Sequence, residues 1–190
     1  MLNELNLKAT SKKCHFGSHE VTYVGYTLSN KGIKPSARHT DGLMKYKKPI
    51  NGKDLKSFIG LCNYFHKFVE GFSTKIRPLR EVDLKLKKND PVPWTTELEN
   101  CFENMKRVLL ESTLVLPSEY PDFVLETDAS DGAIGGVLIE IGKGVVAYLS
   151  RDLRGAELGY GASHKEALSI KWCMDQVRPL ILGRKFKVKT

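Results

Sequence analysis

Asp128 and Glu166 are the two residues whose placement in the sequence is best suited to metal chemistry. Asp128 lies in Thr127-Asp128-Ala129-Ser130, directly after the apolar run Phe123-Val124-Leu125, and such a run is typical of a buried strand. Glu166 follows 38 residues later, near the start of a helical pattern over residues 162–182. A carboxylate on that helix can face the end of the strand and share a cation with Asp128. The spacing therefore predicts half of a metal site.

Other interpretations of the chemically active residue types are simpler. A strand-end aspartate can cap a turn, and a glutamate in a helix can be solvated. Cys14, His15 and His19 could hold a metal in principle, but the four cysteines form no CxxC pair, which favours reduced core thiols. The glycines at positions 132, 135 and 136 do not form a phosphate loop, because a strand follows them and no Gly-Lys-Ser/Thr is present.

The elements around these carboxylates predict an α+β unit. Besides the strand that ends at Asp128, the sequence predicts strands over residues 133–141, 144–149 and 185–188. The helix over 162–182 lies between the last two of them, and a helix over 97–110, capped by Thr95 or Thr96, precedes the first strand. Three antiparallel strands, a helix and a further strand would bring Asp128 to the rim of a sheet.

The N-terminal half predicts an extended ribbon followed by helices. Residues 21–28 are rich in β-formers, and Ser29-Asn30-Lys31-Gly32 is a turn signal. Apolar residues then recur at three- and four-residue spacing from Leu55 to Phe72, which predicts an amphipathic helix. A second short helix is predicted from Phe72 to Val82.

The exposed face of the first helix contains Lys56, Gly60 and Tyr64, spaced by four residues. A glycine inside a helix costs roughly 1 kcal/mol relative to alanine, so its presence needs a reason. Its missing side chain lets another backbone approach, either a packed helix or a nucleic-acid groove whose phosphates the lysines would meet. The row alone does not choose between these two.

Charge is divided unequally between the two halves of the 190-residue chain. Residues 1–95 hold 18 Lys and Arg against 8 Asp and Glu, whereas residues 96–190 hold 12 against 14. The basic half is therefore the candidate for binding a polyanion, with a solvated lysine-rich face as the simpler alternative. The composition, 41% hydrophobic and 27% charged, is that of a globular protein.

Targeting signals do not stand out in the sequence. No apolar run approaches the roughly 18 residues of a membrane span, and the first residues resemble no signal peptide. We expect an intracellular protein that is neither secreted nor bound to a membrane.

A series of short motifs runs along the whole chain in a fixed order. They are Lys13-Cys14-His15-Phe16, Tyr23-Val24-Gly25-Tyr26, Gly32-Ile33, residues 55–65 (LKSFIGLCNYF), Phe72-Ser73, Pro78-Leu79, Trp94-Thr95, Thr127-Asp128-Ala129-Ser130, Tyr148-Leu149-Ser150-Arg151, residues 157–160 and His164-Lys165-Glu166-Ala167-Leu168. In this order the motifs resemble part of the Pol polyprotein of a gypsy-type LTR retrotransposon. The resemblance spans the end of the reverse transcriptase and the beginning of its ribonuclease H domain.

The resemblance implies a fold and a division into domains. It implies an α+β chain with a reverse transcriptase palm-end hairpin over residues 1–35 and a helical thumb with a basic connector over 36–93. A truncated ribonuclease-H-like mixed sheet with a helix follows over 94–190.

The resemblance also implies two sets of site residues. Val24-Gly25-Tyr26 would lie in the hairpin that holds the primer terminus, and the helix over 55–69 would track the minor groove. The implied nucleic-acid contacts are Val24, Gly25, Tyr26, Lys53, Lys56, Gly60, Asn63, Tyr64 and Lys67. Asp128 and Glu166 match two of the carboxylates that bind two Mg²⁺ ions, which cut the RNA strand of an RNA–DNA hybrid. The implied partners are an RNA–DNA hybrid or primer–template duplex and the other parts of Pol, in a cytoplasmic particle or the nucleus.

Two departures from the family pattern bear on activity. The Tyr-x-Asp-Asp turn of the polymerase is not in the sequence, and the third ribonuclease H carboxylate is expected directly after Thr190. The complete parent would polymerise DNA on RNA and hydrolyse hybrids, whereas we expect this chain alone to be inactive or barely active. The alternative function is that of a noncatalytic nucleic-acid-binding relic or domesticated module.

Overall fold

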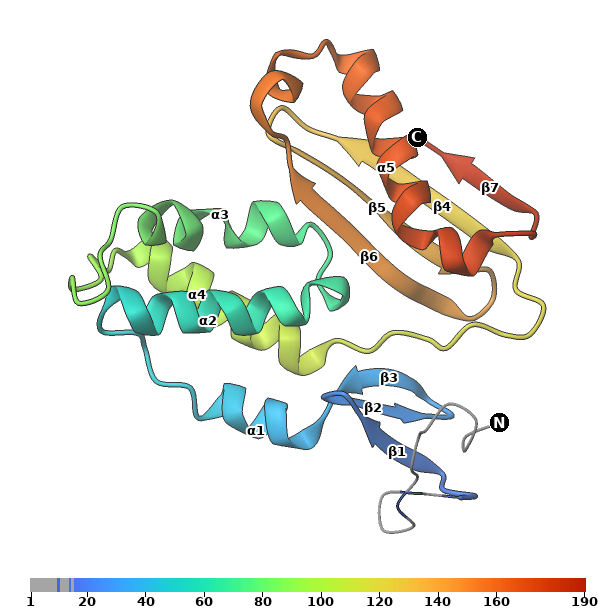
Figure 1. Cartoon of the computed structure of the whole chain (residues 1–190), viewed down its shortest axis with the longest axis horizontal. Coiled ribbons are helices and arrows are strands. Elements are labelled where there is room, and N and C mark those ends of the chain that lie inside the picture. The colour runs from blue at the N-terminus through green and yellow to red at the C-terminus, as the bar shows by residue number, and fades with distance from the viewer. Residues whose placement is uncertain (1–9, 11–13, 15) are drawn as a thin grey trace.

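The computed structural model describes Thr10, Cys14 and residues 16–190, so Lys13 and His15 of the first motif lie outside the described part. Figure 1 shows a small N-terminal sheet, a group of helices and a larger sheet covered by one long helix. In order, the elements are β1 (Glu20–Tyr23), β2 (Tyr26–Ser29), β3 (Gly32–Pro35), α1 (Ala37–Met44), α2 (Gly52–Tyr64), the 3₁₀ helix η2 (His66–Phe68), α3 (Phe72–Asp83), α4 (Thr96–Glu111), β4 (Phe123–Ala129), β5 (Ala133–Glu140), β6 (Gly144–Asp152), the 3₁₀ helix η3 (Gly155–Gly159), α5 (Ala162–Ile181) and β7 (Phe186–Lys189).

The N-terminal sheet is an antiparallel meander in the order β1-β2-β3. Its first hairpin pairs Tyr23 with Tyr26 across a two-residue turn at Val24 and Gly25, both of which have positive φ. The β-rich run over residues 21–28 is therefore two strands and not one. Helix α1 was not predicted; it follows Pro35 with its N-cap at Ser36.

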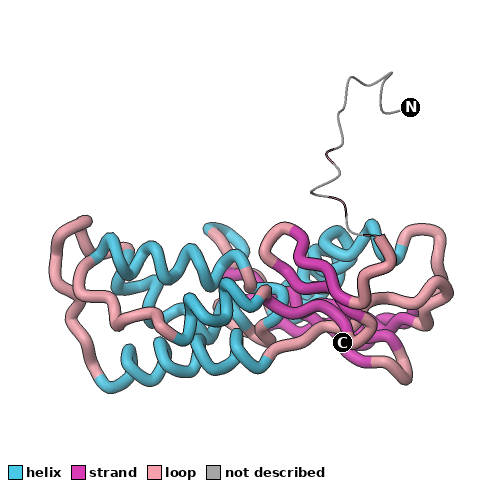
Figure 2. Tube along the Cα trace, turned by 90° about the horizontal axis from the view of Figure 1, so that it is seen from below, coloured by secondary structure: helices cyan, strands magenta, loops and turns pink. Residues whose placement is uncertain are grey.

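Helices α2, α3 and α4 share one apolar core. Their buried faces contribute the largest side chains of this core, among them Phe58, Ile76 and Phe102. The rings of Phe58 and Phe102 lie 4.6 Å apart between α2 and α4. Figure 2 shows these helices gathered toward one end of the molecule and the sheets toward the other.

Helix caps agree with the local sequence. Asn51 accepts a hydrogen bond from the backbone of Asp54 at the start of α2, and Thr95 does the same for Leu98 at the start of α4. Of the two cap residues predicted for α4, Thr95 is thus the one that caps it.

Helix α2 ends earlier than the periodicity predicted. Its last residue is Tyr64, and Lys67 lies in the 3₁₀ helix that follows, so the predicted helix through Val69 was too long. The Phe65 amide bonds to the carbonyl of Cys62, three residues back, which tightens the last turn. The tightening lets Phe65 and Phe68 pack against Tyr26 of the hairpin.

The larger sheet is mixed, with the order β6-β5-β4-β7. Strands β4, β5 and β6 pair antiparallel, and β7 returns parallel to β4 after α5, as a crossover connection requires. Helix α5 covers one face of this sheet (Figure 1), where Phe123, Leu125 and Leu138 pack against Cys173 and Val177. The predicted strands and helix of this half are confirmed.

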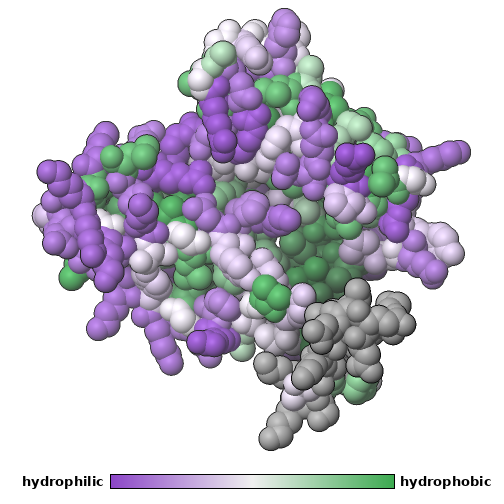
Figure 3. Space-filling view, in the orientation of Figure 1, coloured by the Kyte–Doolittle hydropathy of each residue, from purple (hydrophilic) through white to green (hydrophobic). Residues whose placement is uncertain are grey.

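In Figure 3, hydrophilic side chains dominate the surface over the helical end of the molecule. No helix of the described part is long and apolar enough to cross a membrane.

We expect Phe102→Ala to lower the free energy of unfolding by about 3–5 kcal/mol, because Phe102 is 2% exposed and fills the space between α2 and α4. Urea unfolding followed by circular dichroism would measure this. Asn100→Ala, at an exposed position of the same helix, is the matched control and should change the free energy little. Equal effects of both substitutions would contradict the assignment of α4 to the helical core.

Candidate functional site

Asp128 is the penultimate residue of strand β4. It is exposed and pairs with Gly135 of β5, whereas its neighbour Thr127 is buried. A Cβ at Gly136, which pairs with Thr127, would come within 2.9 Å of Cys173 Sγ, so this pair faces α5. Because side chains alternate along a strand, Asp128 belongs to the opposite face of the sheet.

A groove of about 440 Å³ lies against this opposite face. Its sheet wall includes Glu126, Asp128 and Gly135, and its other wall is the start of α3, with Glu70, Gly71 and Thr74. The candidate catalytic aspartate therefore faces a hollow to which both halves of the chain contribute.

Helix α5 is fixed to the strand end by a buried hydroxyl. Ser169 Oγ lies 2.9 Å from the carbonyl oxygen of Asp128 and 2.9 Å from that of Gly135, so its hydrogen is shared between the two acceptors. Glu166 lies three residues earlier, hence on the same side of the helix and nearly one turn closer to its N-terminus. The half-buried Glu166 carboxylate accepts a hydrogen bond of 3.0 Å from Thr190 Oγ1.

Strand β7 reaches the same end of the sheet. Its parallel register pairs Lys189 with Glu126, and Lys189 Nζ lies 3.1 Å from the carboxylate of Glu126. Asp128 and Glu166 thus both lie at the end of the sheet toward which β4 and β7 run. Glu166 is not among the residues that line the groove.

Metal-binding capacity in the described residues is limited to partial sites. Across residues 16–190 with Thr10 and Cys14, no group of three or more His, Cys, Asp or Glu side chains is arranged to hold a metal ion. Cys14 and His19 belong to no such group, and His15 lies outside the described residues. Asp128 and Glu166 supply the hard oxygen donors that Mg²⁺ prefers, but as a pair. Their catalytic and metal-binding roles stay a prediction.

Lys165 makes a second contact between α5 and the end of the strand. This contact was not predicted from the sequence. The side chain of Lys165 is largely buried, and Nζ donates to the carbonyl of Asp131 at 3.3 Å in the β4–β5 turn. Its position directly before Glu166 in the sequence could have indicated that Lys165 lies near the candidate carboxylates. Ser169 was missed as well, although it lies at the helical spacing i+3 from Glu166.

The exposed stripe of α2 is the second candidate site. It contains the predicted nucleic-acid contacts Lys53, Lys56, Gly60, Asn63 and Tyr64, while Leu55, Phe58 and Cys62 on the other side are buried. A Cβ built on Gly60 meets nothing within 4 Å among the described residues. Helix packing, one of the two explanations left open for this glycine, is therefore excluded for the described part of the chain.

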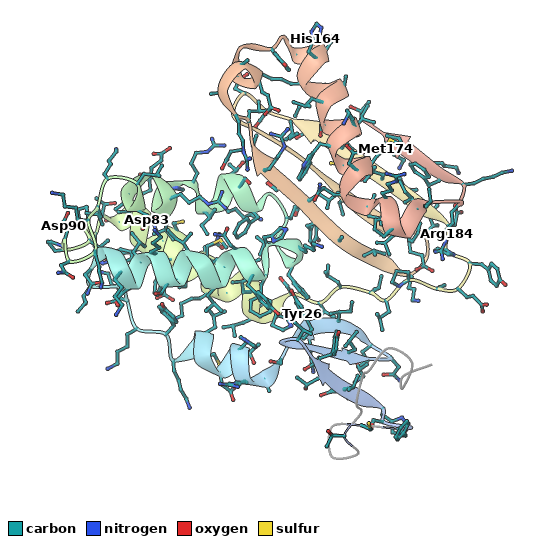
Figure 4. All side chains as sticks on the ribbon, viewed as in Figure 1. Tyr26, Asp83, Asp90, His164, Met174 and Arg184 are labelled. Atoms are coloured by element: carbon teal, nitrogen blue, oxygen red, sulfur yellow. The ribbon has the colours of Figure 1, made fainter. Side chains whose placement is uncertain are left out.

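Two stripe residues, Asn63 and Tyr64, make hydrogen bonds to other elements. Asn63 Oδ1 accepts a 2.7 Å hydrogen bond from Arg80 of α3, and the Tyr64 hydroxyl donates to the carbonyl of Val24. Lys67 is exposed on the 3₁₀ helix beyond the end of α2. Tyr26 lies where the small sheet meets the helices (Figure 4), and burial together with the nearby Tyr64 raises its pKa.

Cys62, Cys101 and Cys173 agree with the interpretation as core thiols, whereas Cys14 belongs to neither core. Cys14, Cys62, Cys101 and Cys173 are all free, and Cys62 and Cys173 are fully buried. Burial raises the pKa of Cys62 to about 12 and that of Cys173 to about 11, so both stay protonated at neutral pH.

A mixed sheet with a helix that brings carboxylates to one end defines a ribonuclease-H-like domain. The chain belongs to the family of RNase H-like domains found in reverse transcriptase, whose family model matches residues 94–188. It is 36% identical over 194 residues to the retrovirus-related Pol polyprotein from transposon 412 of Drosophila melanogaster, covering 98% of this chain and 15% of that protein. It is 34% identical over 174 residues to the transposon Tf2-3 polyprotein of Schizosaccharomyces pombe, covering 89% of this chain and 13% of that protein.

Solved structures show the same fold. The foamy viral protease-reverse transcriptase in complex with RNA/DNA hybrid superposes with a TM-score of 0.77 at 24% identity, over 90% of this chain and 23% of that one. The same viral enzyme in complex with dsDNA gives a TM-score of 0.76 at 24% identity, over 90% of this chain and 36% of that one. The predicted α+β fold and the relationship to retrotransposon Pol polyproteins are confirmed. The chain spans less than a fifth of the length of the relatives named above.

The predicted boundary between the second and third domains lies at residues 93 and 94. The family model begins at Trp94, at the predicted boundary, yet the apolar face of α4 shares one core with α2 and α3, against which Val145 and Tyr148 of β6 also pack. The division into residues 1–35, 36–93 and 94–190 stays a prediction.

We expect Ser169→Ala to destabilise the protein by about 1–3 kcal/mol, because the buried hydroxyl is a hydrogen-bond donor from α5 to two carbonyls of the β4–β5 hairpin. Chemical denaturation would measure the change, with Ser163→Ala, exposed on the same helix, as the control. A Ser169→Ala protein as stable as the control would show that this hydroxyl does not hold the helix.

Proposed function

We propose that this chain is a segment of a gypsy-type LTR retrotransposon Pol polyprotein that binds an RNA–DNA hybrid or primer–template duplex along the exposed stripe of α2. In the complete, intracellular parent protein, this segment would position the duplex for DNA synthesis. The rim of its larger sheet would contribute two carboxylates to hydrolysis of the RNA strand.

The observation that carries the proposal is Gly60. It lies inside a 13-residue helix, on an exposed face, with open space where its side chain would be. Such a glycine lowers helix stability, and no contact among the described residues explains it. A ligand backbone that approaches the helix closely at this point supplies the reason.

The charge of the same face suits a nucleic-acid backbone. Lys53 and Lys56 lie before Gly60 along the stripe, and Lys67 lies beyond it, all exposed. A row of lysines on both sides of a close approach can contact phosphates without reading bases. The foamy viral neighbours, which share this fold, were solved with RNA/DNA hybrid and with dsDNA.

The hairpin turn would form the second contact with the duplex. Val24 and Tyr23 are exposed at its tip, and the turn is joined to the C-terminal end of α2 through Tyr64. In the proposed function this turn holds the primer terminus while the helix follows the groove.

The sheet rim would hold Mg²⁺ together with ligands from the rest of Pol. Asp128 presents its carboxylate to the groove, and Glu166 is oriented by its hydrogen bond from Thr190. Bound Mg²⁺ supplies an activated water and neutralises charge on the phosphate during hydrolysis. The parallel register pairs Glu126 with Lys189, so a ligand two residues beyond Lys189 would lie level with Asp128, where the resemblance implies the third carboxylate.

One observation favours a second candidate function, a noncatalytic nucleic-acid-binding module. In the described residues, the α2 stripe presents all its predicted basic contacts, whereas the acidic side chains provide no group of three around a possible metal. Binding without cleavage would then be the activity of this chain.

We expect Gly60→Ala to raise the free energy of unfolding by roughly 0.5–1 kcal/mol through helix propensity. The same change should weaken binding to a labelled RNA–DNA hybrid by about tenfold, or about 1.4 kcal/mol, because the methyl group blocks the close approach. Fluorescence anisotropy across a salt series, with thermal unfolding in parallel, would measure both effects, and wild-type affinity should fall steeply with salt.

Gly42→Ala is the matched control for Gly60→Ala. Gly42 also lies in a helix, is exposed and has open space around it, but it belongs to α1 and lies outside the stripe. Its substitution should stabilise the protein to a similar extent and leave hybrid binding unchanged. Hybrid binding that Gly60→Ala leaves intact would contradict the proposed contact surface.

We expect millimolar Mg²⁺ to shift the NMR amide signals of residues 127–129 and 165–167, because carboxylates at both positions would share the cation. Asp128→Asn should abolish these shifts. Asp122→Asn, an exposed position just before the other end of β4, should keep them. Shifts that survive Asp128→Asn would place the cation elsewhere.

A further inference from the structure

We propose that Tyr64 is a positioning residue: it holds the strained Val24–Gly25 turn at the end of α2 and does not itself contact nucleic acid. The inference rests on the proposed function and revises the role expected for Tyr64 within it. Through Tyr64, the turn proposed to hold the primer and the helix proposed to follow the duplex would keep a fixed relative position.

The turn has an unusual conformation for its sequence. Val24 has a φ of 45° and Gly25 a φ of 78°, and Val24 is the one non-glycine residue with positive φ in the described part of the chain. Positive φ at both central residues is the conformation of a tight hairpin turn, in which asparagine, aspartate or glycine is preferred at the first position. A β-branched residue there is strained. Since Val24 is 61% exposed, burial of its side chain does not explain the choice.

Both carbonyl oxygens of the turn accept hydrogen bonds from the helical part of the molecule. The Tyr64 hydroxyl donates to the carbonyl of Val24, and the backbone N–H of Ser36, just before α1, donates to the carbonyl of Gly25 at 2.9 Å. Two donors from outside the hairpin therefore fix the turn, which accounts for the persistence of a strained residue.

Tyr64 is itself held in place by the neighbouring aromatic residues. Its ring stacks on Tyr26 at 5.5 Å between centroids and 12° between planes, and on His39 at 6.1 Å and 18°. The Tyr26 hydroxyl in turn donates to the carbonyl of Tyr64 at 3.2 Å. Both the ring and the hydroxyl of Tyr64 are thus occupied by the protein, although the residue is 42% exposed.

Gly25 has a steric reason within the same contact. A Cβ at this position would lie 3.0 Å from His39 Cε1 and 3.1 Å from Tyr64 Oη. The turn therefore packs directly on Tyr64 and His39, and its outward groups are the side chains of Tyr23 and Val24, which are 68% and 61% exposed. These two side chains are the ones that a bound strand would meet.

Tyr64→Phe removes the hydroxyl and keeps the ring, so it isolates the hydrogen bond to the turn. In the free protein, we expect faster amide hydrogen exchange at residues 23–26. With the labelled RNA–DNA hybrid, we expect affinity to fall by roughly three- to tenfold with an unchanged salt slope, because no phosphate contact is lost. Tyr120→Phe, at a tyrosine that is 88% exposed, is the matched control and should change neither reading.

A double-mutant cycle with Val24→Gly separates positioning from direct contact. Glycine adopts positive φ without strain, so a Val24→Gly turn should depend less on the Tyr64 hydroxyl. Tyr64→Phe should then cost less affinity in the Val24→Gly background than in the wild type. An equal loss in both backgrounds would overturn the inference in favour of direct contact.

The exchange measurement keeps this inference distinct from the proposed function. Unchanged exchange at residues 23–26 in Tyr64→Phe would overturn the positioning role whether or not the protein binds a duplex. A wild-type chain that binds no hybrid would refute the proposed function, while faster exchange in Tyr64→Phe would still show that Tyr64 holds the turn.

Discussion

The close approach of α5 to the β4–β5 hairpin is the constraint on which the sheet rim depends. A Cβ at Gly136 would lie 2.6 Å from the carbonyl oxygen of Glu126 and 2.9 Å from Cys173 Sγ, so the helix can lie this low only over a glycine. At that height the Ser169 hydroxyl reaches the carbonyls of Asp128 and Gly135. The hydrogen bonds fix the rotation of the helix and thereby the place of Glu166, nearly one turn away. Two carboxylates from distant segments reach one end of the sheet because of this packing.

The two sides of helix α2 have different environments, one buried in the helical core and one exposed. Its apolar side, with Leu55, Phe58 and Cys62, is buried in the core shared with α3 and α4, which holds the helix rigid. Its other side can then remain open, with Gly60 facing empty space. The stability lost at this glycine is small compared with the burial of the opposite face. A rigid helix with a flat, basic face is suited to follow a duplex.

The helical body and the sheet are joined by a compact polar contact. Asp152, at the end of β6, accepts hydrogen bonds from Arg77 at 3.3 Å and Arg80 at 3.0 Å, and Ser150 accepts from the first turn of α3. Arg80 also donates to Asn63 of the α2 stripe. Partly exposed ion pairs contribute little stability one by one, but a shared carboxylate fixes direction. Through these contacts, the exposed stripe of α2 is connected by Arg80 to Asp152 at the end of β6.

The local features of the molecule could be predicted from the sequence, because hydrophobic period, caps and turn residues act over a few positions. The existence of helices α2 to α5, the strands of the larger sheet and the place of Asp128 at a strand end follow from them. Contacts between distant segments decided the rest. The break at Val24–Gly25 needs Tyr64, 40 residues away, and the early end of α2 needs Tyr26 of the hairpin. The partner of α4 and the face to which Asp128 belongs follow from packing in three dimensions, which no local period encodes.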